Sequence, residues 1–188
     1  AIEAAFDRFL ASAVDRIVCI DDPRAEGDAM GRPDPRAERL AHRHGAVTVG
    51  EAEGARYRLH DVAVRHLTTT FGLTVDGTEV GPVTIGTPGR HHARNAAVAL
   101  ATAAGLGVPL ADGVQALAAY QGVARRFAVV GEVGGVTVVD DYAHNPGKVR
   151  ALLAGAREAG WPRVVAVFQP HRWSRTRDQL ADLGAALA

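Results

Sequence analysis

The chain has one cysteine, one lysine and no net charge, and each shortage excludes a class of protein or site. Cys19 has no partner for an internal disulfide, which predicts a reducing compartment and a buried, unreactive thiol. Twenty-one basic and 21 acidic residues cancel, so no overall field favours nucleic acid or an anionic membrane. No stretch approaches the roughly 18 apolar residues that span a bilayer. We therefore expect a cytoplasmic protein that binds neither nucleic acid nor membrane.

The only lysine, Lys148, excludes one type of nucleotide site. The Gly-x-x-x-x-Gly-Lys-Ser/Thr loop that cradles phosphates needs a lysine after its glycines, and that string does not occur. Eight histidines show no close metal-ligand spacing, so His42/His44 and His91/His92 are interpreted as surface pairs and no structural metal is expected. We expect this chain not to hydrolyse ATP unaided.

Both ends of the chain fall inside stretches with helical spacing, residues 1–10 and the segment from about 176, which predicts a part of a longer protein. The apolar run at 16–20 suits a buried parallel strand. Residues 24–44 are interpreted as a helix after a polar lead-in. The first helix is expected to pack one face made of Ile2, Phe6 and Phe9 or Leu10.

From residue 46 to residue 85 the pattern changes to short β-like runs. We interpret this region as an antiparallel sheet with a hairpin at Asp76-Gly77, because that pair favours the tight turns of hairpins. The expected strands are residues 47–49, 57–64 and 68–75.

A domain boundary is expected in the basic stretch at 122–127. Before it, residues 92–104 and 110–120 predict helices. After it, strands and helices alternate, which predicts a right-handed parallel crossover with ligands at the carboxyl ends of the strands. The expected strands there are 128–133, 136–141 and 163–168, and the expected helices are 146–159 and the segment from about 176. We therefore divide the chain into residues 1–124 and 125–188.

Polar clusters follow two of the strands expected in the second domain. They are residues 140–146 and 169–176. One interpretation is that Asp141 and Pro146 only begin a helix and that the arginines are solvated. Because both clusters lie at the crevice of an open parallel sheet, we favour a ligand site. Arg172 and Arg175 can hold a carboxylate together, and His171 adds a donor.

The first domain offers polar side chains at the start of its Ala-rich helix. The amide of Asn95 can donate and accept at once, which suits an adenine edge, although an ordinary polar first turn fits equally well. Arg125 and Arg126 could reach phosphates once the domains close, whereas paired arginines in a linker are more often solvated.

Four ordered motifs resemble those of the Mur ligase family, and the strand ending in Asp21-Asp22-Pro23 extends the resemblance to nearly the whole chain. The motifs are Gly89-x-His91-x-x-x-Asn95-Ala96-x-x-Ala99, Gly122-x-x-Arg125-Arg126-Phe127, Asp140-Asp141-Tyr142-Ala143-His144-x-Pro146 and Gln169-Pro170-His171-Arg172-x-Ser174-Arg175-Thr176. The last motif is similar to that of the alanine-adding branch.

The resemblance implies an α/β fold. The end of a central ATPase domain, a parallel sheet plus antiparallel strands, would precede the first part of a Rossmann-like C-terminal domain that binds the amino acid. It implies that the full-length protein uses ATP and Mg²⁺ to ligate L-alanine to UDP-N-acetylmuramate through an acyl phosphate, in peptidoglycan precursor synthesis. The alternatives are a recycling ligase that joins a murein peptide to the same nucleotide, and a non-catalytic Mur-fold binding module.

The resemblance also implies roles for single residues. Adenine would be bound by His91, His92 and Asn95, the ribose by Asp141, and the phosphates by Arg126, which would also be catalytic. The muramoyl substrate would face Tyr142 and the catalytic His144, while the carboxylate of L-alanine would be bound by His171, Arg172 and Arg175. Metal ligands are expected mainly outside this chain. The family usually has asparagine where this chain has His92, so a rearranged adenine contact is expected. Asn145 also departs from the alanine-adding branch, which commonly has a histidine there.

Overall fold

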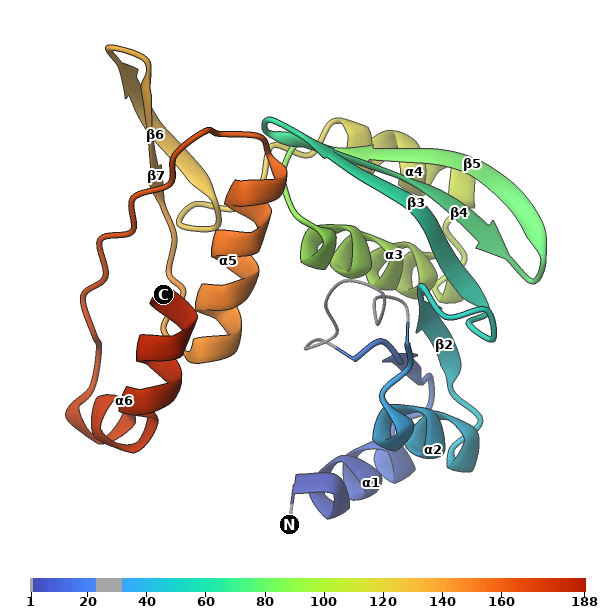
Figure 1. Ribbon diagram of the computed structural model, residues 1–188. Helices are drawn as coiled ribbons and strands as arrows, with labels where there is room; N and C mark the ends of the chain where they lie inside the picture. Colours follow the sequence, from blue (N-terminus) through green and yellow to red (C-terminus); the bar gives the residue numbers. More distant parts are fainter. Residues whose placement is uncertain (1, 23–31) are drawn as a thin grey trace.

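The computed structural model describes residues 2–22 and 32–188, and its strands form two separate sheets (Figure 1). The first sheet has the order β1 (Ile17–Cys19), β2 (Val47–Gly50), β3 (Tyr57–Arg65), β4 (Thr68–Val75) and β5 (Thr78–Ile85). The first three strands are parallel, and the last three pair antiparallel. This mixed sheet, followed by a second α/β unit, confirms the predicted fold class.

The prediction that residues 46–85 are antiparallel throughout was wrong at β2. That strand pairs in parallel with both β1 and β3, so only the β3–β4–β5 meander is antiparallel. A short Val-Thr-Val run looks the same in either kind of ladder, because its partners lie elsewhere in the chain. The hairpin at Asp76-Gly77 forms as predicted, with φ angles of 49° and 77°.

Two helices, α3 (Arg90–Gly105) and α4 (Leu110–Ala118), cover one face of this sheet. α3 lies close to the strands because its inward positions are small, with Ala93, Ala97 and Ala101 at most 3% exposed. Alternate sheet residues supply the larger side chains of the same core. These are Leu59, Phe71, Leu73, Val83 and Ile85. The packing fixes the start of α3 at the carboxyl end of the parallel strands.

Only one residue of the apolar face expected on α1 (Ile2–Ser12) is buried. Of the alternatives Phe9 and Leu10, Leu10 packs inward at 6% exposed, whereas the prediction was wrong for Ile2 and Phe6, which remain in solvent. Ion pairs turn the polar side of α1 toward α2 (Pro35–Arg43). Asp34 caps α2 by accepting a hydrogen bond from the backbone of Arg36. The expected lead-in at 24–31 lies outside the described residues.

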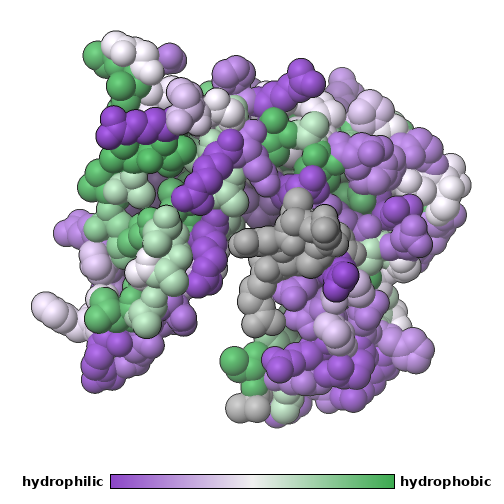
Figure 2. All heavy atoms as spheres, viewed as in Figure 1, coloured by the Kyte–Doolittle hydropathy of each residue, from purple (hydrophilic) through white to green (hydrophobic). Residues whose placement is uncertain are grey.

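The second sheet is a hairpin of β6 (Ala128–Val133) and β7 (Val136–Asp140), followed by α5 (Pro146–Glu158) and α6 (Trp173–Leu187). Gly134 and Gly135, both at positive φ, make its tight turn. Figure 2 shows apolar side chains gathered on the surface of this part of the molecule. Val133 and Val136 are 78% and 63% exposed there.

The strand predicted at 163–168 does not form, so the predicted parallel crossover is absent from the described residues. The segment is irregular, and Val167 is 96% exposed. A cavity of about 560 Å³ is lined both by this segment and by β7. A parallel strand needs a hydrogen-bonded neighbour, and this segment has none in either sheet.

α5 joins the two parts by packing against the start of α3 (Figure 1). A Cβ on Gly155 would lie 3.2 Å from the carbonyl oxygen of Pro88 and 3.3 Å from the Cα of Gly89, so a side chain there would crowd this backbone contact. The backbone N–H of His66, between β3 and β4, donates to Ala159 at 3.0 Å. None of the helices in the described ranges is long and apolar enough to cross a bilayer.

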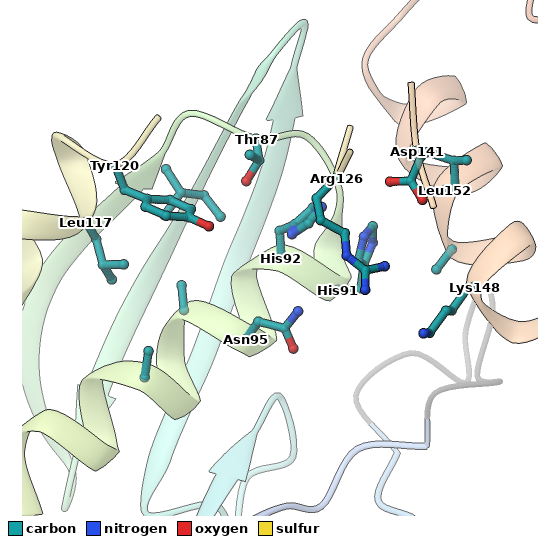
Figure 3. Close-up of a pocket in the computed structure, with 14 residues that line it drawn as sticks. Thr87, His91, His92, Asn95, Leu117, Tyr120, Arg126, Asp141, Lys148 and Leu152 are labelled. Atoms are coloured by element: carbon teal, nitrogen blue, oxygen red, sulfur yellow. The ribbon is translucent and has the colours of Figure 1, made fainter. Parts of the chain in front are cut away.

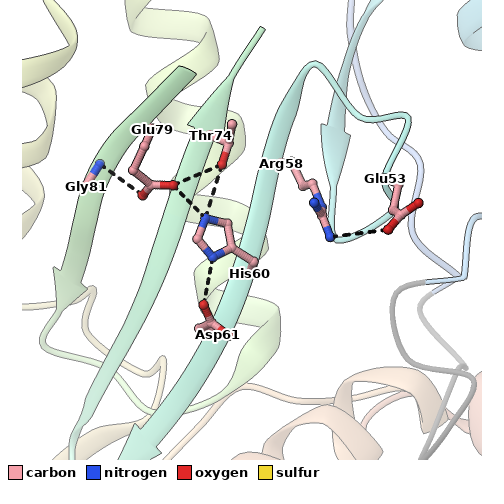
Figure 4. A network of polar contacts seen from close by, with 7 residues as sticks. All are labelled: Glu53, Arg58, His60, Asp61, Thr74, Glu79 and Gly81. Atoms are coloured by element: carbon pink, nitrogen blue, oxygen red, sulfur yellow. Dashed lines mark hydrogen bonds and ion pairs between the residues drawn. The ribbon is translucent and has the colours of Figure 1, made fainter. Parts of the chain in front are cut away.

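The face of the antiparallel strands that α3 leaves uncovered carries a polar network around His60 (Figure 4). The imidazole lies 2.9 Å from Asp61 through Nδ1, and its Nε2 lies 3.1 Å from both Glu79 and the hydroxyl of Thr74. A Cβ on Gly72 would lie 2.2 Å from the ring, so a side chain at this position would displace the imidazole. The hydrogen bond to Asp61, followed by the charge of Glu79, raises the pKa of His60.

This network predicts a pH-dependent contribution to stability. Because the folded pKa of His60 lies above its unfolded value, the contribution is complete below about pH 6.5 and is lost as the pH rises through the folded pKa. Solvent screening keeps it below about 1 kcal/mol. The stability advantage of the wild type over His60→Gln, measured by urea unfolding at each pH between about 5.5 and 8.5, should shrink as the pH rises. Comparing the two proteins at the same pH removes the opposite slope that the lowered pKa values of His91 and His92 give to both. The exposed His42→Gln variant should behave as the wild type, and a wild-type slope in His60→Gln would refute the assignment.

Candidate functional site

A cavity of about 600 Å³ lies between the first sheet with α3 and α4 on one side and α5 on the other (Figure 3). Five residues predicted from the sequence line it, although they come from separate segments. They are His91, His92, Asn95, Arg126 and Asp141. The remaining lining is mostly apolar and comes from α3, α4, β5 and α5. It includes Ile85, Ala96, Ala99, Leu117, Tyr120, Ala151 and Leu152.

The start of α3 presents its polar residues to the cavity through helical spacing. His92, Asn95, Ala96 and Ala99 are three or four residues apart and therefore share one face. Gly89 precedes the helix at φ 116°, where a Cβ would also lie 2.9 Å from the His91 ring. Glycine at this position thus lets the chain turn sharply into α3 while the imidazole folds back over it.

The two histidines form a partly buried pair, so the interpretation of them as a surface pair was wrong. Their ring centroids are 4.0 Å apart. Burial, with smaller effects from His92 and Arg94, lowers the pKa of His91 to about 4. Burial also lowers the pKa of His92, against the opposing charge of Asp141. Both rings are therefore neutral at pH 7, and each presents one donor and one acceptor.

The Asp141 carboxylate holds the segment that connects the two parts of the chain, residues 125–127, which is called the hinge below. One oxygen accepts from the backbone N–H of Phe127 at 2.8 Å, and the other from that of Ala143 at 2.7 Å. Arg125 and Phe127 have φ of 61° and 47°, so Arg126 lies between two left-handed residues and extends into the cavity (Figure 3). The alternative that Asp141 merely caps a helix is wrong.

Asn145 is the residue that caps α5. Its side chain accepts from the backbone N–H of Lys148 at 3.0 Å, and Pro146 is the first helical residue. Nearby, the Tyr142 and His144 rings are 5.1 Å apart, and His144 Nδ1 lies 2.8 Å from the Tyr142 carbonyl. Both lie within three residues after Asp141 but outside the cavity lining.

The structure does not bring the third predicted cluster to this cavity. His171 and Arg172 precede α6, and Arg175 lies in its first turn, far from α3 in Figure 1. The first two are exposed, and Arg175 is half-buried. Because 163–168 leaves the sheet instead of continuing it as a strand, the cluster does not lie at the sheet edge that the sequence pattern predicted.

Lys148 is the charged cavity residue that the sequence analysis did not assign to a site. It lies in the first turn of α5, and its side chain reaches the cavity that Arg126 and His91 also line (Figure 3). Tyr120 and Thr87 were missed as well. The available signal was the position of Lys148 three residues after a helix cap that itself follows Asp141.

A buried ionic cluster holds the opposite side of α3 against the parallel strands. Arg94 Nε lies 2.8 Å from Asp21 Oδ2, and its Nη2 donates to Glu51 at 2.9 Å. Arg90 donates to the same Glu51 carboxylate at 2.8 Å. Asp21 is buried, which raises its pKa against the opposing effect of Arg94, and a Cβ on Gly50 would lie 2.4 Å from its Oδ1. The cluster therefore fixes the helix that carries the cavity's polar residues.

Comparison with known proteins identifies relatives of this chain. Residues 125–188 match the Mur ligase, glutamate ligase domain. The chain is 41% identical over 194 positions to UDP-N-acetylmuramate–L-alanine ligase of Acidothermus cellulolyticus, covering 100% of this chain and 39% of that relative. It is 46% identical over 151 positions to the ligase of the same name from Streptomyces coelicolor, covering 80% of this chain and 32% of the relative.

Solved structures show the same fold over nearly the whole chain. UDP-N-acetylmuramate-alanine ligase from Thermotoga maritima superposes with a TM-score of 0.72 at 25% identity, over 98% of this chain and 38% of that one. Folylpolyglutamate synthetase from Lactobacillus casei gives 0.65 at 16% identity, over 100% and 45%, and this likeness concerns the fold alone. The chain spans less than half the length of each of these proteins. Its motifs, fold and relatives together show that the chain belongs to the Mur ligase family.

Proposed function

We propose that the full-length protein is an ADP-forming ligase that joins L-alanine to UDP-N-acetylmuramate in the cytoplasm, for peptidoglycan precursor synthesis. In this proposal the present chain supplies the adenine-nucleotide cavity, with residues 1–124 from the central domain and 125–188 from the amino-acid-binding domain. The observation that carries it is the convergence of α3 with Arg126 and Asp141 on one cavity. The names of the relatives support the choice of substrates.

The cavity has the size and chemistry that an adenine nucleotide needs. About 600 Å³ is within the usual range for small-molecule sites, and an apolar wall suits a flat base. The amide of Asn95 and the neutral imidazole of His92 can each donate to and accept from the base edge. The Asp141 oxygens each accept one backbone bond and retain a lone pair for a ribose hydroxyl.

Other residues of the chain would bind the phosphates, the muramoyl group and L-alanine. Arg126 would bind a phosphate with its guanidinium fork, and His144 would act with it at the reaction centre. Tyr142 would contact the muramoyl group, while His171, Arg172 and Arg175 would bind the carboxylate of L-alanine. Bound ATP supplies the phosphoryl group that activates the muramate carboxylate. The Mg²⁺ that accompanies ATP would be held mainly by residues elsewhere in the full-length protein.

Adenosine binding tests the cavity without requiring turnover. Asn95→Ala should weaken adenosine binding by about tenfold, because one paired hydrogen-bonding group is lost. His92→Asn should retain binding, since an amide offers the same donor and acceptor pattern as the neutral ring. Isothermal titration of the chain measures both.

The matched control is Gln115→Ala, which removes an exposed amide from α4 outside the cavity lining and should leave adenosine binding unchanged. If the wild-type chain does not bind adenosine, the nucleotide assignment is wrong. An equal loss in Asn95→Ala and Gln115→Ala would also contradict it.

A further inference from the structure

Lys148 gives the cavity a second cation from the opposite wall. The cap made by Asn145 and the first helical residue, Pro146, fix the first turn of α5, and Lys148 leaves that turn toward the cavity (Figure 3). Its side chain borders the same space as Arg126, which comes from the hinge. Two cations from separate elements therefore face one cavity.

Neither cation is neutralised by a protein carboxylate. In the described part of the chain, Arg126 and Lys148 form no ion pair, whereas Arg125 pairs with Asp140 at 3.5 Å. Asp141 is the acidic residue in the lining, and each of its oxygens already accepts a backbone N–H. The histidines add no charge at neutral pH, because burial lowers their pKa. The cavity thus has an excess of positive charge that an anionic ligand would balance.

The charge is also placed asymmetrically. Leu117 and Tyr120 line the end of the cavity next to α4, whereas Lys148 lies at the end next to α5 (Figure 3). A ligand with a flat apolar part and an anionic part would lie with its base toward α4 and its anion toward α5.

We infer that Lys148 is a phosphate-binding residue that acts together with Arg126 on the nucleotide, an inference that rests on the proposed function. An ammonium group provides a compact charge with three donors for phosphate oxygens, which complements the planar guanidinium. Lys148 thereby contributes to the discrimination of nucleotide from nucleoside, which no other lysine in this chain could do.

Titration with ADP and adenosine separates this role from base binding. Lys148→Ala should weaken ADP binding by about tenfold and leave adenosine binding unchanged, because only ADP carries phosphate. Lys148→Arg should keep most of the ADP affinity, which shows that charge rather than packing is responsible. Arg150→Ala is the matched control, since Arg150 lies on the same helix and its guanidinium contacts the Asp182 carbonyl at 3.4 Å instead of the cavity.

The outcomes distinguish the inference from the proposed function. If Lys148→Ala keeps the wild-type ratio of ADP to adenosine affinity, Lys148 is not a phosphate-binding residue, and the adenine cavity stands. An equal loss of ADP affinity in Arg150→Ala would attribute the effect to overall charge and would also overturn the inference. If the wild-type chain binds neither adenosine nor ADP, both the inference and the proposed function are wrong.

Discussion

Replacing Arg94 by methionine is expected to lower the free energy of unfolding by about 3–5 kcal/mol, the usual cost of removing one partner from a buried ion pair. The substitution leaves Asp21 and Glu51, whose side chains are 1% and 11% exposed, without their shared guanidinium. Urea unfolding followed by circular dichroism measures the loss. Because Arg94 lies in the first turns of α3, we also expect weaker adenosine binding in this variant.

The loss of unfolding free energy in Arg94→Met should depend on pH, in a direction set by the pKa of Asp21. Burial already raises the pKa of Asp21, and loss of the guanidinium should raise it further. A carboxyl with a raised folded pKa destabilises the fold as the pH rises from the unfolded toward the folded value, so protonation at lower pH relieves the variant. The difference in the free energy of unfolding between Arg94→Met and the wild type should therefore shrink as the pH falls from about 8 to about 5.

Arg39→Met provides the control for this prediction. Arg39 pairs with Glu3 at 3.5 Å, and both side chains are largely exposed, so the change should cost less than about 1 kcal/mol. Equal losses in the two variants would mean that the Asp21, Glu51 and Arg94 cluster does not hold α3 in place.

Elements whose ends are set by neighbouring residues were predictable from the sequence. The strand at 68–75 has the predicted bounds because alternating side chains run directly into Asp76-Gly77. The helix beginning at Pro146 was also predicted, since proline is favoured at the first helical position. In both cases the information lies within a few residues of the feature.

The pairing partners of a strand and the buried face of a helix could not be predicted from neighbouring residues. Val47 to Val49 has one local pattern for parallel and antiparallel ladders, and its true partners, β1 and β3, are distant or separated by a turn. The apolar spacing of Ile2 and Phe6 predicted burial, but the ion pairs of Asp7 with Arg43 and His44 direct another side of α1 toward α2. These outcomes depend on contacts between segments.

At the candidate site, too, residues within motifs were predictable, whereas a residue placed by contacts between segments was not. The family resemblance implied that residues of α3, Arg126 and Asp141 would contribute to one nucleotide site, and the structure places all of them around one cavity. Lys148 was missed because a lysine in the first turn of a helix is ordinarily solvated. Its role depends on the packing of α5 against α3, where Gly155 meets Gly89, and that contact has no local signature.

In the full-length enzyme, Arg172→Ala or Arg175→Ala is expected to raise the KM for L-alanine by roughly ten- to a hundredfold, the loss of one charge-assisted hydrogen bond or more. Both arginines lie at the start of α6, outside the lining of the nucleotide cavity, so the affinity for ATP should change little. Lysine at either position should rescue only in part, because an ammonium keeps the charge but lacks the planar fork that matches a carboxylate.

Arg177→Ala is the matched control for this last prediction. Arg177 is on the same helix and pairs at 2.8 Å with its neighbour Asp178, at a side-chain exposure of 78%, so its loss should leave the alanine KM unchanged. Steady-state kinetics with alanine and ATP varied separately distinguish the outcomes. If the Arg172 and Arg175 variants kept their alanine KM and lost affinity for ATP, these arginines would belong with Arg126 at the nucleotide. In that case the start of α6 would have to approach α5 and α3 in the working enzyme.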